Sequence, residues 1–382
     1  MRRKVALIVE TSTGYGRSIL SGIVRYRRSA QWAVFLEQRD LLSRLPAWIE
    51  NWQGHGIISR VTNRKLANLV RRKNIPLVEL TDRGKGFDFP TVRTDDYAVG
   101  VLAAEHLFER GFRNLAFCGY QHEAWSTRRE AAFSKHANDN GAALSVFRSP
   151  WLNKSANPWE IEQQQLALWI ASLPKPVGVM SCNDVRGQQV LEACSRANVT
   201  VPEEVAVVGV DDDQMICELC EPPLSSVATN ATTVGFRAAE LLDQMMAGET
   251  TFESVTQLTP IGITVRQSTD VVAISDRDVA AAITYIRENA CHGISVKDIL
   301  ANVPVSRSTL ERQLRRYFNR SPQQEIRSVQ IKRAKGLLSE TDLSMEQIAG
   351  RCGFDHPEYM HVVFKREVGI TPGQFRRNSQ PS

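Results

Sequence analysis

Up to about residue 270, short apolar runs alternate with amphipathic stretches. The runs are too apolar for a half-exposed sheet, so they predict parallel strands buried on both faces. They lie at 5–9, 56–59, 76–80, 115–118, 177–180 and 205–210. Apolar residues at helical spacing predict helices between them, at 16–27, 63–73, 95–110, 160–171, 185–197 and 233–246. This alternation predicts a doubly wound α/β architecture, long enough for two lobes.

The pattern changes near residues 268–275, where the apolar strand runs stop. From Asp276 to the end, the spacing of apolar residues is helical throughout. We therefore predict an α/β domain over 1–270, a linker over 271–275 and an all-α domain over 276–382.

Composition narrows the class of protein. No apolar run approaches the ~20 residues of a membrane helix, and the basic start is followed by a run that ends at Glu10, too short for a signal peptide. The seven cysteines are scattered, as in a reducing cytoplasm, and the pair Cys217 and Cys220 lacks the further ligands of a zinc site. We expect a cytoplasmic protein that uses no membrane, metal or cofactor.

The positive charge is confined to the tail. Residues 276–382 hold 17 Lys and Arg against 12 Asp and Glu, whereas the first 275 residues hold 30 of each kind. A cationic module attached to a neutral body is typical of a polyanion-binding unit, although so small a surplus also fits a solvated surface.

Helix starts can be located in the tail from their capping chemistry. An N-cap residue with a carboxylate or amide three positions later satisfies backbone N–H groups that the first turn leaves unpaired. This spacing occurs at Ser295 and Asp298, Ser321 and Gln324, Ser344 and Gln347, and Asp355 and Glu358. Helices at 296–302 and 306–318 then form one helix-turn-helix, and helices at 345–352 and 355–367 form a second.

A helix over 322–339 joins the two helix-turn-helix units, and Pro322 suits its first turn. Its apolar residues predict the face that docks on the core, and its cations predict the face that points outward. The apolar set is Ile331, Ala334, Leu337 and Leu338, and the outward set is Lys332, Arg333 and Lys335.

The tail resembles the AraC family of transcription regulators over about a hundred residues. The resemblance rests on Ile348-Ala-Gly-Arg-Cys-Gly-Phe354, Tyr359, Phe364-Lys-Arg366, Gly369-Ile-Thr-Pro372 and Phe375-Arg376, and on Ser306-Arg-Ser-Thr-Leu310 with Arg312 and Phe318. It implies that two helices enter successive major grooves of promoter DNA, ~34 Å apart. A generic helical bundle is the alternative.

The same resemblance implies the residues that contact DNA. Base edges would face Ser308, Glu311 and Arg312 from the first reading helix, and His356, Glu358, Tyr359, His361 and Val362 from the second. Val362 is a departure, because relatives often carry a polar or basic residue there. Phosphates would be met by Arg307, Arg315, Arg316, Lys332, Lys365 and Arg366. For each cation, a solvated helix face is the alternative.

Three motifs in the body resemble the ligand-binding domains of LacI-type repressors and periplasmic sugar-binding proteins. They are Arg129-Glu-Ala-Ala-Phe133, Ser181-Cys-Asn-Asp184 and Val208-Gly-Val-Asp-Asp212. A fixed guanidinium with several carboxylates or amides can satisfy the hydroxyls of a polyol. We therefore expect sugar contacts from Arg129, Asn183, Asp184 and Asp211, with Thr13, Tyr15 and Asp95 as further candidates. Trp125 either stacks on a sugar ring or packs in the core.

In order and length, and in the segments Arg266-Gln-Ser-Thr-Asp270 and Tyr285-Ile-Arg-Glu-Asn-Ala-Cys-His-Gly293, the whole chain resembles a family of xylose-responsive operon activators from enteric bacteria. The resemblance implies a two-lobed periplasmic-binding-protein-like sensor with parallel doubly wound sheets, followed by an all-α double helix-turn-helix domain. It also implies a cytoplasmic homodimer that activates sugar-utilisation genes, with D-xylose as effector and RNA polymerase as a partner. A regulator of the same type that responds to a different sugar or polyol is the alternative.

Two other classes of protein compete with a regulator. An enzyme could use the acids near residues 184 and 211, but no phosphate-binding glycine loop, nucleophile elbow or metal-ligand cluster accompanies them. A transport-type binding protein would need an export signal and has no use for the tail. We therefore expect no catalysis.

Overall fold

The computed structural model describes residues 2–40, 43–80, 87–151, 159–271, 273, 276–318 and 320–379. They form two compact units. Unit 1 contains residues 1–104 and 114–269, and unit 2 contains residues 105–113 and 270–382. Residues 272, 274 and 275 of the expected linker lie outside the described residues.

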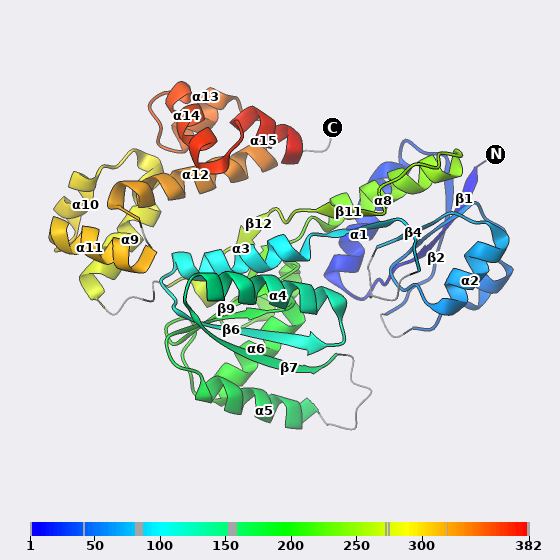
Figure 1. The fold of residues 1–382 in the computed structure, drawn as a ribbon, viewed down its shortest axis with the longest axis horizontal. Coiled ribbons are helices and arrows are strands. Elements are labelled where there is room, and N and C mark those ends of the chain that lie inside the picture. Colours follow the sequence, from blue (N-terminus) through cyan, green and yellow to red (C-terminus); the bar gives the residue numbers. More distant parts are fainter. Residues whose placement is uncertain are drawn as a thin grey trace. The chain divides into compact units, whose positions relative to one another are not determined.

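Unit 1 contains two six-stranded sheets, one in each of two lobes (Figure 1). The first sheet is parallel throughout and has the order β11-β5-β4-β3-β1-β2. Its strands are β1 Arg3–Ile8, β2 Trp32–Leu36, β3 Gly56–Ser59, β4 Leu77–Glu79, β5 Thr91–Thr94 and β11 Val255–Leu258. Because β11 joins from far along the chain, the chain returns to this lobe after building the second one.

The second sheet has the order β12-β10-β9-β8-β6-β7 and is parallel except for its edge strand β12. Its strands are β6 Asn114–Gln121, β7 Ala143–Pro150, β8 Val177–Ser181, β9 Val205–Val210, β10 Ser225–Ala228 and β12 Gly262–Thr264. The first sheet and the five parallel strands of the second confirm the doubly wound fold that the sequence predicts.

Helices cover both faces of each sheet, as buried parallel strands require. In the first lobe, alternate residues of β1 pack against α1 and α8 on one face and against α2 on the other. The helices of unit 1 are α1 Gly14–Arg27, α2 Arg64–Lys73, α4 Ala124–Asp139, α5 Trp159–Ser172, α6 Asp184–Arg196, α7 Gln214–Leu219 and α8 Ala231–Met246. Helix α3, Asp96–Glu109, begins in unit 1, and its last residues belong to unit 2.

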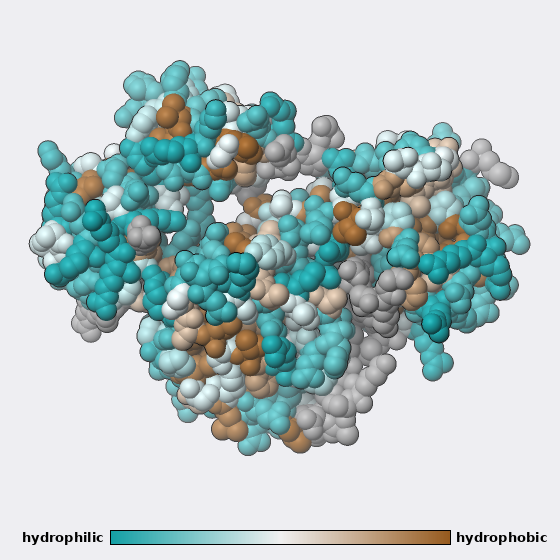
Figure 2. All heavy atoms as spheres, in the orientation of Figure 1, coloured by the Kyte–Doolittle hydropathy of each residue, from teal (hydrophilic) through white to brown (hydrophobic). Residues whose placement is uncertain are grey.

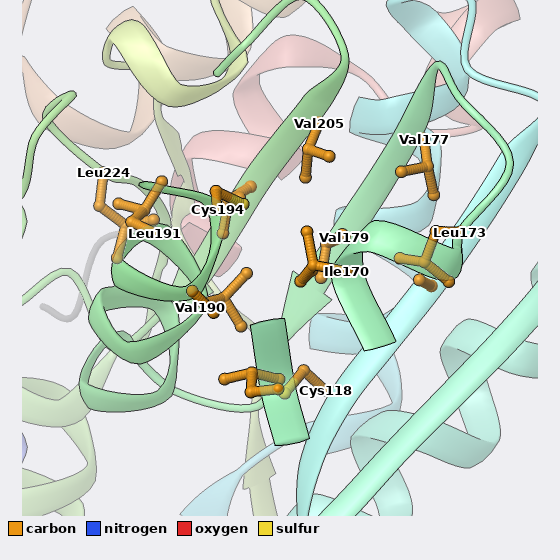
Figure 3. Packing of buried hydrophobic residues seen from close by; sticks show 14 of the residues in the cluster. Cys118, Ile170, Leu173, Val177, Val179, Val190, Leu191, Cys194, Val205 and Leu224 are labelled. Carbon is orange, nitrogen blue, oxygen red and sulfur yellow. The ribbon is translucent and has the colours of Figure 1, made fainter. Parts of the chain in front are cut away.

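The core of the second lobe consists of aliphatic side chains from neighbouring strands and the helices over them. Figure 3 shows this packing for Ile170 of α5 and Leu173 directly after that helix, Val190, Leu191 and Cys194 of α6, Val177 and Val179 of β8, and Val205 of β9. Hydrophilic residues dominate the face drawn in Figure 2, where hydrophobic residues form small patches. None of the described helices has the length and apolar character needed to cross a membrane.

In the long segment of unit 2, 270–382, the described residues form helices and turns and no strand. Its helices are α9 Arg277–Asn289, α10 Val296–Asn302, α11 Arg307–Phe318, α12 Pro322–Glu340, α13 Met345–Arg351, α14 Pro357–Val368 and α15 Pro372–Ser379. They enclose two separate cores, one among α9, α10 and α11 and one among α13 and α14. The connecting helix α12 supplies Ile326 to the first core, and Ile331, Ala334, Leu337 and Leu338 to the second.

Three of the four predicted capping boxes are confirmed, at Ser295, Ser321 and Ser344. The fourth, from Asp355 to Glu358, is wrong. Helix α14 begins with Pro357, its N-cap is His356, and no side chain caps it. The fixed φ of proline is compatible with the first helical turn, so Pro357 sets this helix start without a capping side chain.

One glutamine bridges the two halves of the tail. Gln330 lies on α12 between the residues that supply the two cores, and it is 6% exposed. Its Nε2 donates to Ala290 O in the first half (3.0 Å) and to Gly353 O in the turn of the second half (3.1 Å). Gly353 has φ +74°, and a Cβ there would lie 2.8 Å from Ala290 O, so the halves meet where only glycine fits.

We predict that Gln330→Leu destabilises unit 2 by about 1 to 3 kcal/mol, because it leaves two carbonyl oxygens without this donor while nearly keeping the side-chain volume. Calorimetry of the full chain, following the transition of unit 2, measures the loss. Gln323→Leu, at an exposed position of the same helix, is the matched control and should change stability by less than about 0.5 kcal/mol. Equal shifts for the two variants would contradict a bridging role.

Candidate ligand-binding pocket and nucleic-acid interface

Polar side chains converge in unit 1 where the parallel strands of both lobes end. In a doubly wound fold this edge is the usual place for a ligand. The pocket is lined by seven of the eight residues expected to bind ligand: Thr13, Tyr15, Trp125, Arg129, Asn183, Asp184 and Asp211. Their ligand contacts remain a prediction.

Arg129 is the buried cation of the pocket. Its side chain, on α4, is 5% exposed, and its Nε donates to Asp96 Oδ1 at 3.0 Å. Its Nη1 donates to Cys182 O at 2.6 Å, and its Nη2 lies 3.6 Å from Asp211 Oδ1. A buried guanidinium requires such partners, because an unpaired charge in the interior is costly. These contacts hold Arg129 in one orientation.

Asp211 supplies an acceptor that the described residues leave unsatisfied. It follows β9 with φ +106°, and its buried Oδ1 accepts no hydrogen bond from the described part of the chain. Burial raises the pKa of Asp211 to about 6, and the charge of Arg129 opposes this rise. An oxygen held in this way can accept a hydrogen bond from a ligand hydroxyl.

Asn183 and Asp184 line the pocket but also support it. Asn183 caps α6, and its Oδ1 accepts from Arg186 N at 2.9 Å. Asp184 is 2% exposed and accepts from Ser226 Oγ at 2.5 Å and from Asp213 N at 2.7 Å. Burial raises the pKa of Asp184 well above its usual range. Asp184 therefore fixes the loop that carries Asp211.

Thr13 and Tyr15 are held by neighbours within the first lobe. The Oγ1 of Thr13 caps α1 by accepting from Gly16 N, and it donates to Glu10 Oε1 at 2.7 Å. The Tyr15 hydroxyl lies 3.0 Å from Thr94 Oγ1, and burial raises the pKa of Tyr15 to about 12. Arg60 pairs with Glu10 and stacks over the Tyr15 ring, 4.6 Å from its centroid.

Two tryptophans form an aromatic wall. Trp125 meets Trp151 edge to face, with ring centroids 5.1 Å apart, and both line the pocket. The Arg129 guanidinium lies 5.1 Å from the Trp125 ring. Trp125 thus packs on protein groups and also lines the pocket. Stacking on a sugar ring and packing in the core are therefore both compatible with its position.

Asp95 is not among the pocket residues. Its Oδ1 accepts from the backbone N–H groups of Tyr97 and Ala98, both at 3.0 Å, and so caps α3. The neighbouring Asp96 faces the pocket instead. Pocket residues that the sequence did not single out include Arg60, Arg93, Asp96, Arg128, Trp151 and Asp213. Arg60 follows β3 directly, so it could have been predicted from the rule that ligands bind where parallel strands end.

Asp213, which lines the pocket, connects the two lobes. Its Oδ2 accepts from Gly14 N, at the start of α1, at 3.0 Å. A Cβ at Gly14 would lie 2.4 Å from the same oxygen, so a side chain there would break this approach. The lobes are therefore joined by direct contact beside the pocket.

Helix α11 of unit 2 presents a polar outer face. Leu310 and Leu314 are fully buried, whereas Ser308, Arg312, Arg315 and Arg316 are exposed. Glu311 pairs with Arg307, its Oε1 2.9 Å from the guanidinium Nε. Of the residues predicted to contact bases, Ser308 and Arg312 therefore share an outer face one turn apart.

Helix α14 is likewise divided into a buried and an exposed face. Met360, Val363 and Phe364 are buried. The exposed set contains the residues expected to meet DNA, namely Glu358, Tyr359, His361, Val362, Lys365 and Arg366, and His356 is exposed at the N-cap. The DNA contacts themselves remain predictions.

Lys332 differs from the other predicted phosphate contacts. It is exposed on α12, as predicted, but its Nζ lies 3.1 Å from Glu109 Oε2 within unit 2. Glu109 O also accepts from the Arg287 guanidinium of α9. The end of α3 is thus bound to two helices of the tail, a feature that the sequence did not predict.

Three domain models match the chain. Residues 4–93 match the XylR N-terminal domain, residues 104–269 match the periplasmic binding protein-like domain, and residues 299–378 match a helix-turn-helix domain. The last two matches confirm the sensor and the DNA-reading architecture expected from the motifs.

A xylose operon regulatory protein of Haemophilus influenzae is 33% identical over 384 residues, which is 98% of each chain. This chain belongs to the family of xylose operon regulatory proteins. The Escherichia coli K12 member of the family is 29% identical over 98% of this chain and 97% of its own. A solved structure described as the xylose-binding transcription activator xylR superposes with a TM-score of 0.63 at 27% identity, covering 100% of this chain and 99% of that one.

The family match confirms the resemblance noted from the sequence.

Among the described residues of this family member, no group of three or more His, Cys, Asp or Glu side chains is placed to hold a metal ion. Cys217 and Cys220 are buried free thiols.

The raised pKa of Asp211 predicts a pH-dependent stability difference between the wild type and Asp211→Asn. The folded state takes up a proton at pH values where the unfolded chain, with an ordinary carboxyl pKa, does not. This contribution to stability is therefore present below about pH 4, falls as the pH rises to about 6, and is absent above it. Asparagine does not ionise, so the variant should be more stable above pH 6, by up to about 3 kcal/mol.

Unfolding of unit 1, followed in the ligand-free chain between pH 4 and 8, measures this difference. Asp95→Asn is the matched control, because an amide oxygen can accept the same two backbone hydrogen bonds. If Asp211→Asn is less stable than the wild type at every pH, the attraction to Arg129 outweighs burial, and a raised pKa for Asp211 is contradicted.

Proposed function

We propose that this chain is a transcription activator that binds promoter DNA through α11 and α14 and responds to D-xylose held between the lobes of unit 1. We choose D-xylose as the effector because the two relatives are xylose operon regulators and the solved relative is described as xylose-binding. D-xylose is a polyol, so its recognition needs several fixed donors and acceptors in one place.

The sugar assignment rests on two groups that lie 3.6 Å apart, the guanidinium of Arg129 and Oδ1 of Asp211. This Oδ1 accepts no hydrogen bond from the described residues, so it is available to a ligand hydroxyl. The guanidinium and the carboxylate offer a donor and an acceptor at fixed positions in a pocket. The two tryptophans add apolar surface beside them, which suits the C–H face of a sugar ring. Arg129, Asn183 and Asp211 are our primary ligand contacts, with Thr13, Tyr15 and Trp125 around them.

The pocket acids support binding rather than catalysis. Asp96 is paired with arginines, and Asp184 and Asp213 accept backbone N–H groups. Carboxylates engaged in this way fix the walls of the site and are not arranged around a nucleophile. We therefore propose that the chain is not an enzyme and needs no cofactor.

For DNA, we propose that Arg312 and Ser308 meet base edges from α11 and that Arg315, Arg316, Lys365 and Arg366 meet phosphates. Glu311 orients Arg307 through their ion pair. Lys332 would reach a phosphate only by leaving Glu109. We also propose domain boundaries near 270 and 276, a cytoplasmic location, a homodimer and contact with RNA polymerase. These follow from the activator architecture of the family.

We predict that D-xylose raises the melting temperature of the full chain. A ligand that binds only the folded state adds about 2.7 kcal/mol at a hundredfold excess over Kd, enough for a shift of several degrees. Asp211→Asn should strongly reduce the shift, because a neutral amide accepts a weaker hydrogen bond than a carboxylate, and the matched variant Asp95→Asn should keep it. L-arabinose, D-ribose and D-glucose serve as comparison sugars.

An unchanged response of Asp211→Asn at the same D-xylose concentration would place the effector site elsewhere. If a comparison sugar shifts the wild type and D-xylose does not, the pocket is a sugar site for a different effector. If none of the four sugars shifts it, the sugar-sensor assignment is wrong.

A further inference from the structure

The outer face of α14 carries an apolar side chain at its centre. Val362 is 64% exposed, and the buried residues Met360, Val363 and Phe364 lie on the opposite side of the helix. Positions three and four residues apart are neighbours on a helix surface. Val362 therefore has Glu358 and Tyr359 one turn before it, and Lys365 and Arg366 one turn after it.

Folding gives no reason for a valine at this position. A β-branched residue is a poorer helix former than alanine, and an exposed side chain recovers little by burial. In the described part of unit 2, Val362 and Tyr359 are the only exposed large hydrophobic residues, and both lie on this face. The apolar exposure of the tail is thus concentrated on one of the two helices expected to enter DNA.

Tyr359 is held in place by its neighbours. Its ring meets Phe354 edge to face at 6.1 Å, and the Arg327 guanidinium lies 5.0 Å from the ring centroid. Val362, one turn further along, therefore sits beside a fixed aromatic ring on one side and two cations on the other. Cations suit the phosphates on either side of a groove, so the chemistry of this face favours duplex DNA over an apolar protein surface.

In the major groove of DNA, the C5-methyl of thymine is the one apolar group that a natural base pair presents. We propose that Val362 determines specificity by packing its methyl groups against the C5-methyl of a thymine in the segment contacted by α14. This inference rests on the proposed function and extends it to a particular base. A polar side chain at the same position would select a hydrogen-bonding base edge instead.

The test begins with the full chain and a random duplex DNA library, from which bound sequences are selected. Each thymine of the selected site is then replaced by deoxyuridine, one position at a time, which removes only the C5-methyl. For the wild type, we expect a roughly fourfold loss of affinity at one thymine, the factor for withdrawing one methyl group from an apolar contact. In Val362→Ala, the loss at that position should disappear.

Two further variants make the comparison specific. Val362→Thr keeps the branched shape and one of the methyl groups, so it should retain part of the penalty for deoxyuridine. Val24→Ala removes an exposed valine of α1 in unit 1 and should leave every penalty unchanged. Thymines whose penalty persists in Val362→Ala are contacted by other residues and serve as internal controls.

The inference is overturned if Val362→Ala keeps each deoxyuridine penalty at its wild-type size, or if the wild type shows none. A site selected without thymine overturns it as well. In each of these cases the chain still selects duplex DNA, so the proposed function stands. If the full chain selects no duplex sequence, the DNA-binding function itself fails and the inference fails with it.

Discussion

The sensor unit is organised around the neutralisation of a buried guanidinium. Arg129 is nearly inaccessible to solvent, so its charge must be balanced by groups that the fold brings to it. Asp96 at the start of α3 does this with a short contact, and Cys182 O adds a hydrogen bond. Asp211 approaches less closely, and its buried Oδ1 accepts no hydrogen bond from the residues that the structure describes. The network thus specifies both a rigid cation and one unsatisfied acceptor, the minimum needed to orient a small polyol.

Several pocket side chains serve this arrangement rather than the ligand. Asp184 holds the loop after β9, and Asp213 of that loop reaches Gly14 of the other lobe. A ligand that completes the hydrogen bonds of Asp211 would therefore act on the same loop that joins the lobes. A switch requires the ligand to stabilise the form with joined lobes more than the alternative form. The reason is that a ligand can shift an equilibrium only by its difference in affinity for the two states.

The tail depends on a comparable constraint, the fixed relation between its two cores. Helix α12 contributes apolar residues to both, and Gln330 lies between them as a polar bridge. Reading successive major grooves requires α11 and α14 to keep a set spacing, which independent helix pairs could not ensure. The specificity proposed for Val362 relies on this rigidity, because a methyl contact is effective only when its position is defined.

Much of this could be predicted from the sequence, and the exceptions have physical causes. Runs of buried aliphatic residues mark central strands, but β7 carries partly exposed positions at the sheet edge and gives no such run. Trp151, just beyond it, was therefore missed. The choice between Asp95 and Asp96 depends on where α3 begins, since adjacent residues at a helix start point in different directions. The contacts of Glu109 with Lys332 and Arg287 of the tail are tertiary, so the spacing of residues along the sequence does not predict them.

We expect sugar binding and DNA binding to be coupled in this chain. Thermodynamic linkage requires the coupling to be reciprocal, so DNA must change the sugar affinity by the factor by which sugar changes the DNA affinity. The most direct test is the Kd of the full chain for D-xylose, measured by calorimetry without DNA and with a saturating selected duplex. We expect the two Kd values to differ by about fivefold or more. Equal Kd values, with both ligands bound, would contradict the coupling.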